Sequence, residues 1–179
     1  MLAVAAVSCT TPAASTSDAP PTPVQTPGEP RALFVRPCES EVSGALGHGW
    51  RTGQITAGPI VFVGARGYAN DRPGLFAAPA QRAKVQKVLV VVTGHDPVEL
   101  SVGVPEAALF YDPARWRDRN VVPFRLGEAR VRFEPCPSGR TQFNGGFLLR
   151  RAACVPVEVH PASGEPMVAT ISFGAGRCT

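Results

Sequence analysis

The chain has 179 residues, a formal net charge of +4 and 44% apolar residues, and 18% of its residues are charged. This composition is typical of a folded globular protein. The basic excess is too small and too dispersed along the chain to indicate a nucleic-acid partner.

The first nine residues combine a short aliphatic run, a small residue and Cys9. The tetrapeptide AVSC resembles the lipobox of bacterial lipoproteins. This resemblance implies that residues 1–9 are the remnant of a signal peptide and that Cys9 carries a lipid after cleavage. A complete signal has a basic segment and a longer apolar core, so we expect the true start to lie upstream. The alternative is a disordered N-terminus in which the cysteine is accidental.

Residues 10–31 form a segment rich in Thr, Pro, Ala and Ser that contains no aromatic side chain. Such a segment has too little apolar surface to offset the entropy of ordering, so it is predicted to be disordered. Its prolines favour extended polyproline II structure, which would span roughly 65 Å at about 3.1 Å per residue. Together with a lipid on Cys9, it would act as a tether that holds a folded domain away from the membrane.

The remaining residues, 32–179, are sufficient for one domain and contain many short candidate strands. Residues 88–92 form a continuous aliphatic run, which predicts a strand buried on both faces. After the turn residues 94–97, apolar side chains alternate with Glu99 and Ser101, so that these two are expected to face solvent. This pattern predicts a hairpin. Other candidate strands are 59–65, 120–126, 128–135, 142–150, 154–160 and 167–174.

The spacing of these segments predicts an all-β fold. Seven to nine short strands in about 148 residues indicate an antiparallel β-sandwich of immunoglobulin-like or related type. Only residues 79–86 are expected to form a turn or two of helix. No internal repeat or second domain is evident.

The sequence contains none of the common catalytic motifs. Ser43 and Ser163 lack the glycine-flanked context of a hydrolase nucleophile, and no Cys-x-x-Cys or His-Glu-x-x-His spacing occurs. No cofactor is expected, and we interpret the domain as non-catalytic.

A candidate binding patch lies within the segment LFYDPARWRDRNVVPF. Tyr111 and Trp116 are interleaved with Arg115 and Arg117, and such a mixture can bind sugars by stacking and anions by bidentate hydrogen bonds. In the alternative interpretation, Trp116 fills one end of the sandwich and the arginines pair with neighbouring aspartates.

A weaker alternative is a copper site of the cupredoxin type. His95, Cys154, His160 and Met167 occur in the order in which such proteins supply their ligands, and these ligand types suit copper electron transfer. The hypothesis requires a free thiolate on Cys154, whereas cysteines of an exported domain normally form disulfides.

Four cysteines of the domain, namely Cys38, Cys136, Cys154 and Cys178, permit three pairings. If the Asn-Gly-Gly of residues 144–146 forms a hairpin loop, Cys136 and Cys154 lie opposite each other. The pairing predicted on this basis is Cys136–Cys154 and Cys38–Cys178, with no free thiol in the domain.

The cysteine near the domain start, the later segment CPSGRTQFNGGFLLRRAACVPVEV and the C-terminal ISFGAGRC resemble secreted or lipid-anchored envelope proteins of actinobacteria. This resemblance implies a location but no catalytic residue. The expected function is therefore binding or scaffolding by a lipid-anchored domain on the outer face of the cell membrane, or by a secreted one. Its expected partners are the membrane, through Cys9, and a cell-wall glycan or an envelope protein.

Overall fold

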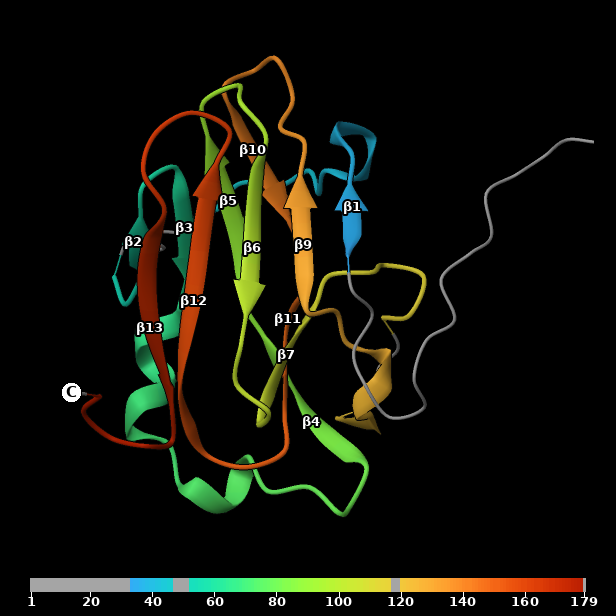
Figure 1. The fold of residues 1–179 in the computed structure, drawn as a ribbon, viewed down its shortest axis with the longest axis vertical. Coiled ribbons are helices and arrows are strands. Elements are labelled where there is room, and N and C mark those ends of the chain that lie inside the picture. Colours follow the sequence, from blue (N-terminus) through green and yellow to red (C-terminus); the bar gives the residue numbers. More distant parts are fainter. Residues whose placement is uncertain (1–32, 47–51, 117–119, 179) are drawn as a thin grey trace, which may run out of the picture.

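The structure is a computed structural model that describes residues 33–46, 52–116 and 120–178. Within those ranges the chain forms thirteen strands and four short 3-10 helices, arranged as two facing layers (Figure 1). The all-β sandwich predicted from the sequence is therefore confirmed, although it has more strands than the seven to nine expected. Cys9 and the predicted tether at 10–31 lie outside the described residues.

The front layer is a five-stranded sheet in the order β1-β9-β6-β12-β13, antiparallel except for the parallel pair β1 and β9. In β6, buried Val98, Leu100 and Val102 alternate with the partly exposed Glu99 and Ser101. This alternation places one face of the sheet on the core and the other toward solvent, as the sequence predicted. The strands are β1 (Phe34–Arg36), β6 (Val98–Val102), β9 (Arg130–Phe133), β12 (Ala153–Pro161) and β13 (Met167–Phe173).

The back layer consists of two four-stranded antiparallel sheets, β10-β5-β3-β2 and β7-β11-β4-β8. The first contains β2 (Ile55–Ala57), β3 (Ile60–Val63), β5 (Leu89–Thr93) and β10 (Arg140–Phe143). The second contains β4 (Arg82–Lys87), β7 (Ala107–Phe110), β8 (Val121–Pro123) and β11 (Gly146–Leu149).

Two chain segments pass directly from one back sheet to the other. Only Val88 separates β4 from β5, and only two residues separate β10 from β11. The backbone N–H of Val88 donates to the carbonyl of Gly145 at 2.9 Å, so the two crossing segments remain hydrogen-bonded at the bend. The back layer is therefore one long pair of strands that bends in the middle.

Both glycines at this bend lie against other atoms. A Cβ on Gly146 would stand 1.8 Å from the carbonyl oxygen of Gln86, and one on Gly145 would stand 2.1 Å from the ring of Tyr111. Glycine is needed here because the crossing strands approach closely, and not because the chain reverses.

Two predicted hairpins are therefore wrong. Residues 144–146 do not form a hairpin loop, because β10 pairs with β5 while β11 pairs with β4 and β7. Residues 94–97 connect β5 in the back layer to β6 in the front layer, so these two strands do not pair with each other. The predicted burial of β5 on both faces is confirmed, since Val90, Val91 and Val92 are fully buried.

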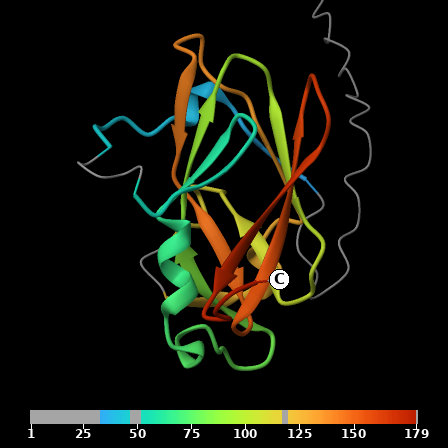
Figure 2. The same cartoon turned by 90° about the vertical axis from the view of Figure 1, so that its left-hand side faces the viewer.

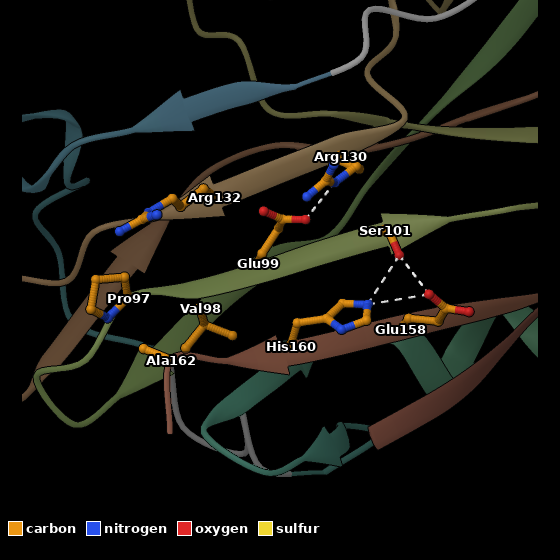
Figure 3. A pocket seen from close by; sticks show the side chains of 9 residues that line it. All are labelled: Pro97, Val98, Glu99, Ser101, Arg130, Arg132, Glu158, His160 and Ala162. Atoms are coloured by element: carbon orange, nitrogen blue, oxygen red, sulfur yellow. Dashed lines mark hydrogen bonds and ion pairs between the residues drawn. The ribbon is translucent and has the colours of Figure 1, made fainter. Parts of the chain in front are cut away.

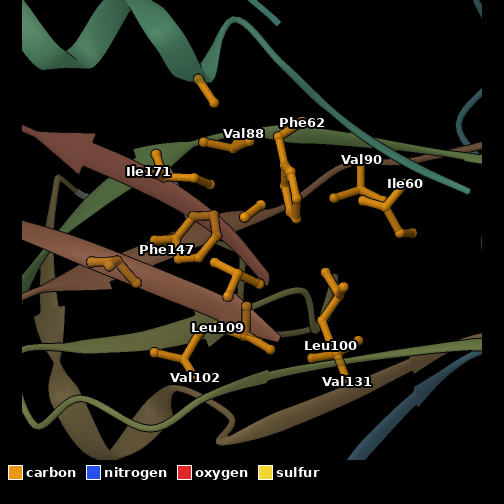
Figure 4. Close-up of a cluster of buried hydrophobic side chains, with 14 of the residues drawn as sticks. Ile60, Phe62, Val88, Val90, Leu100, Val102, Leu109, Val131, Phe147 and Ile171 are labelled. Atoms are coloured by element: carbon orange, nitrogen blue, oxygen red, sulfur yellow. The ribbon is translucent and has the colours of Figure 1, made fainter. Parts of the chain in front are cut away.

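The main core lies between the two layers and receives aliphatic and aromatic side chains from all three sheets (Figure 4). A second, smaller core covers the outer face of the β7-β11-β4-β8 sheet. That sheet is consequently buried on both faces, which explains why every residue of β7 and β11 is buried. The second core contains Ala83, Ala108, Phe110, Val122, Phe124 and Leu148, with Val85, Trp116 and Leu126 packed on it.

The helices are short, with three residues each except for the six of η2, and they connect strands or lie at one end of the sandwich. They are η1 (Cys38–Ser40), η2 (Ala65–Asn70), η3 (Pro73–Leu75) and η4 (Phe124–Leu126). Figure 2 shows η2 and η3 at the end opposite to the β5–β6 and β12–β13 loops. The helix expected at 79–86 is wrong, because β4 occupies most of this segment and pairs with β8 and β11. Tertiary pairing overrides local propensity there.

The four cysteines form two disulfides, Cys38–Cys136 and Cys154–Cys178. The predicted pairing is therefore wrong, although the prediction that all four are oxidised is confirmed. The parallel register of β1 and β9, with Arg36 opposite Phe133, brings Cys38 beside Cys136. At the other site, Ala153 pairs with Phe173, so the tail after β13 ends near the start of β12.

Candidate functional site

A groove of about 500 Å³ lies on the outer face of the front sheet, where β6, β9 and β12 run side by side (Figure 3). Its polar side chains point out of the sheet because they alternate with the residues that point into the core. The volume falls within the range of ligand-binding clefts. The groove is lined by Pro97, Val98, Glu99, Ser101, Arg130, Arg132, Glu158, His160 and Ala162.

Strand register arranges the polar side chains in two rows across the groove. Arg130 of β9 lies opposite Ser101 of β6, which in turn lies opposite Glu158 of β12. In the neighbouring row, Arg132 lies opposite Glu99, and Glu99 lies opposite His160. Each row thus begins with a guanidinium group on β9 and crosses two further strands.

The two arginines are held differently. Nε of Arg130 donates to Oε1 of Glu99, and this hydrogen bond raises the pKa of Arg130. Nε of Arg132 lies 3.7 Å from Oε1 of Glu134, and both of those side chains are about half exposed. Exposed pairs of this kind contribute little stability, so their significance lies in how they orient the side chains.

Ser101, Glu158 and His160 form a compact cluster on the other side of the groove (Figure 3). Ser101 Oγ donates to Glu158 Oε2 at 2.9 Å, and His160 Nε2 lies 3.2 Å from the same oxygen and 3.4 Å from Ser101 Oγ. The hydrogen bond from Ser101, followed by that from His160, lowers the pKa of Glu158. Glu158 is therefore an anion near neutral pH.

This cluster contains the residue types of a catalytic triad in a different arrangement. In a triad, one imidazole nitrogen accepts the serine proton while the other donates to the acid. Here a single nitrogen, Nε2, faces both the hydroxyl and the carboxylate, and the hydroxyl of Ser101 donates a hydrogen bond to Glu158. The contacts within the cluster therefore differ from those of a catalytic triad and orient Glu158.

A second groove, of about 360 Å³, lies at the end of the sandwich between the β5–β6 and β12–β13 loops. His95 and Met167 both line it, together with Pro59 and Glu165. In its wall, Ser163 Oγ donates to Asp96 Oδ2 at 3.2 Å.

The structure does not assemble the proposed copper ligands. Cys154 is bonded to Cys178, so it supplies no thiolate. Cys154 and His160 are six residues apart on β12, which separates them by about 20 Å along the strand. His160 lines the outer groove, whereas His95 and Met167 line the groove at the loop end. Among the described residues, no three His, Cys, Asp or Glu side chains are grouped to hold a metal ion.

The predicted patch at Tyr111, Arg115, Trp116 and Arg117 is not a continuous surface. Tyr111 is fully buried, and its hydroxyl donates to the carbonyl of Val88 at 3.0 Å. Burial raises the pKa of Tyr111 strongly, so its hydroxyl remains protonated. Arg117 lies outside the described residues. Tyr111 is therefore excluded from the binding surface predicted for it.

The alternative interpretation of this segment is confirmed for Arg115. Trp116 is packed against the protein as expected, although on the outer face of the back layer and not at one end of the sandwich. Arg115 forms an ion pair with Asp112, with Nε and Oδ2 3.2 Å apart. Trp116 stacks on Phe110 with ring centroids 5.3 Å apart, and it packs on the second core. Asp118, the other expected partner of the arginines, lies outside the described residues.

Trp116→Ala should lower the free energy of unfolding by about 2 kcal/mol, because the partly buried ring covers the second core. Urea denaturation of the oxidised protein measures this change. Leu75→Ala removes a side chain that is 57% exposed, so this control should change stability by less than about 0.5 kcal/mol. Unchanged stability of Trp116→Ala would contradict the packing role and favour a recognition role for this ring.

A deeply buried arginine lies away from both grooves. Arg36 is 1% exposed, and its guanidinium donates to the carbonyls of Tyr111, Asn144 and Ser40. Burial lowers the pKa of Arg36, whereas the nearby acidic side chain of Glu128, which is itself fully buried, acts to raise it. The bonds to Tyr111 and Asn144 hold β1 against the segments that directly follow β7 and β10 in the back layer, which is a structural role.

No protein family model matches the chain, and neither does any curated protein or solved structure. The likeness to actinobacterial envelope proteins therefore stays a prediction. None of the helices in the described part of the chain is long and apolar enough to cross a membrane.

The sequence predicted that Glu99 and Ser101 face outward, but it did not predict the groove that they form with Glu158. The alternation of apolar and polar residues in β6 and β12 was the only local sequence pattern that indicated which side chains face outward. Nothing in the sequence indicates that β6 lies between β9 and β12, since β6 and β12 are more than fifty residues apart.

Proposed function

We propose that this chain is an exported, lipid-anchored domain of a bacterial cell envelope, and that it acts by binding rather than by catalysis. The outer groove is its binding surface. The lipid on Cys9 provides the membrane attachment, and the segment at 10–31 separates the domain from the bilayer. Release into the medium as a secreted protein is the alternative location.

The observation that carries the binding proposal is the arrangement of charged side chains in the outer groove. Arg130 and Glu158 are oriented by neighbouring groups. Pre-oriented polar groups reduce the entropy that is lost on binding. The two disulfides support an oxidising compartment, where such bonds persist.

The lining of the groove also favours one kind of partner. Among the described residues that line it, none is Phe, Tyr or Trp, so the groove lacks the large rings on which sugars usually stack. An envelope protein or peptide therefore suits the groove better than a cell-wall glycan does.

The location is tested by expressing the gene from its native locus and separating membranes from the soluble fraction. The wild-type protein should sediment with membranes, and Cys9→Ser should move it to the soluble fraction or the medium, because the acylation site is lost. Ser8→Ala keeps a small residue before the cysteine and serves as the control. Wild-type protein that is already soluble would contradict the anchor.

Binding is tested with purified Cys9→Ser protein added to washed envelopes. It should be retained on them, and the double variant Arg130→Gln, Glu158→Gln should be washed away. Equal retention of both proteins would exclude the outer groove, and no retention of either would contradict the binding proposal.

A further inference from the structure

We propose that the row Arg130–Ser101–Glu158 binds a short, extended peptide that presents a carboxylate to Arg130 and an ammonium group to Glu158. The inference rests on the proposed function, because it specifies the ligand class of that binding surface.

The groups at the two ends of this row have unused binding capacity. Arg130 uses Nε to bond Glu99, so its two terminal nitrogens keep their donors free among the described residues. These nitrogens form the fork that matches a carboxylate. Glu158 receives both of its contacts on Oε2, so Oε1 remains free to accept from a ligand ammonium group. Both side chains are more than half exposed.

The spacing of the row fits a peptide of about three residues. Arg130 and Glu158 are two strands apart, and neighbouring strands are separated by about 4.8 Å, which places their Cα atoms about 10 Å apart. An extended chain spans at most about 3.3–3.6 Å per residue, so the ends of a tripeptide are also about 10 Å apart. Ser101 lies between them, beneath the middle of the ligand.

The charge balance of the groove favours a ligand with both signs. Two arginines are matched by two glutamates among the lining residues, so neither a polyanion nor a polycation meets a surface of uniform opposite charge. Opposite charges at the two ends of one row select a zwitterion of the matching length and orientation.

The neighbouring row lacks this arrangement and provides an internal control. It begins with Arg132 but ends at His160, and His160 is engaged with Glu158. A ligand on the first row therefore depends on Arg130 more than on Arg132, although both arginines belong to the same face of β9.

The experiment titrates the full-length oxidised protein with trialanine by NMR. Four forms of the probe carry free ends, an acetylated N-terminus, an amidated C-terminus or both caps. Free trialanine should bind at least tenfold more tightly than the doubly capped form, and the singly capped forms should fall between them. Dialanine should bind more weakly, because it is too short to reach both ends.

The variants assign each charge to its partner. The Arg130→Gln variant should bind trialanine equally well with a free and with an amidated C-terminus. The Glu158→Gln variant should bind it equally well with a free and with an acetylated N-terminus. Arg132→Gln should keep affinity within about twofold of wild type. Amide spectra identify any variant that fails to fold, and Arg130→Lys then supplies the second test, because it keeps the charge but loses the fork.

Equal binding of free and doubly capped trialanine would overturn the inference, and so would an Arg132→Gln variant that loses as much affinity as Arg130→Gln. If free trialanine does not bind while the Cys9→Ser protein is still retained on envelopes, the proposed ligand class is wrong and the binding proposal stands.

Discussion

Replacing Gly146 by alanine should lower the free energy of unfolding by at least about 3 kcal/mol. The new Cβ would lie 1.8 Å from the carbonyl oxygen of Gln86 and 3.0 Å from the backbone nitrogen of Val88. Both atoms belong to backbone, so no change of side-chain rotamer relieves the overlap, and the pairing of β4 with β11 must separate. Forced overpacking of this kind costs about 1–3 kcal/mol and sometimes more.

Urea denaturation of the oxidised protein measures the change. Gly103→Ala is the matched control, because no atom lies within 4 Å of its added Cβ and its φ is not in the left-handed region. The control should remain within about 0.5 kcal/mol of wild type. A Gly146→Ala protein as stable as the control would show that the two crossing segments do not approach as closely as described.

Removing the Cys38–Cys136 disulfide should destabilise the protein more than removing Cys154–Cys178. The two bonds close loops with sequence separations of 98 and 24 residues. By the loop-entropy model, the first contributes about 4.7 kcal/mol and the second about 3.4 kcal/mol, because the longer loop restricts the unfolded chain more.

Both cysteines of a pair are changed to alanine, so that no free thiol remains to exchange. The unfolding free energies of the two double variants are compared in urea, with a non-reduced peptide digest to verify the connectivity. An equal or larger loss in the Cys154, Cys178 double variant would contradict the loop argument. A digest that links Cys38 to Cys178 would contradict the structure.

Strand positions were predictable from the sequence because burial is a local pattern. The aliphatic run of β5 and the alternation in β6 indicated correctly which side chains are buried. Strand pairing was not predictable to the same degree, because it depends on segments far apart in the chain. The assumed hairpin at 144–146 shows this limit, since Gly145 and Gly146 fit a turn and a close strand crossing equally well.

The wrong disulfide pairing follows from the same cause. Cys136 was matched with Cys154 across the assumed hairpin, whereas its partner is determined by the parallel pairing of β1 with β9. A parallel pair between the first strand and one nearly a hundred residues later leaves no local signal. For β12 and β13 a signal was present, because they are consecutive strands and Cys154 and Cys178 lie near their paired ends.

The candidate site was only partly predictable for a similar reason. Aromatic and arginine residues around Tyr111 suggested an exposed patch, but a sheet buried on both faces shows no alternation by which Tyr111 could be recognised as core. The outer groove consists of ordinary surface residues on three strands. Their grouping depends on register, which the sequence does not show.

The Cys38–Cys136 bond also determines how the molecule carries load. A pull on the N-terminal side would first peel β1 from β9, a contact of only three residue pairs. Extension would then stop at Cys38, and tension would pass through the disulfide to Cys136, three residues after the end of β9. Because β9 forms one wall of the outer groove, a partner held there would be coupled mechanically to the N-terminus through one strand and one covalent bond. The 97 residues between the two cysteines, including most of the core, would bear little of that force.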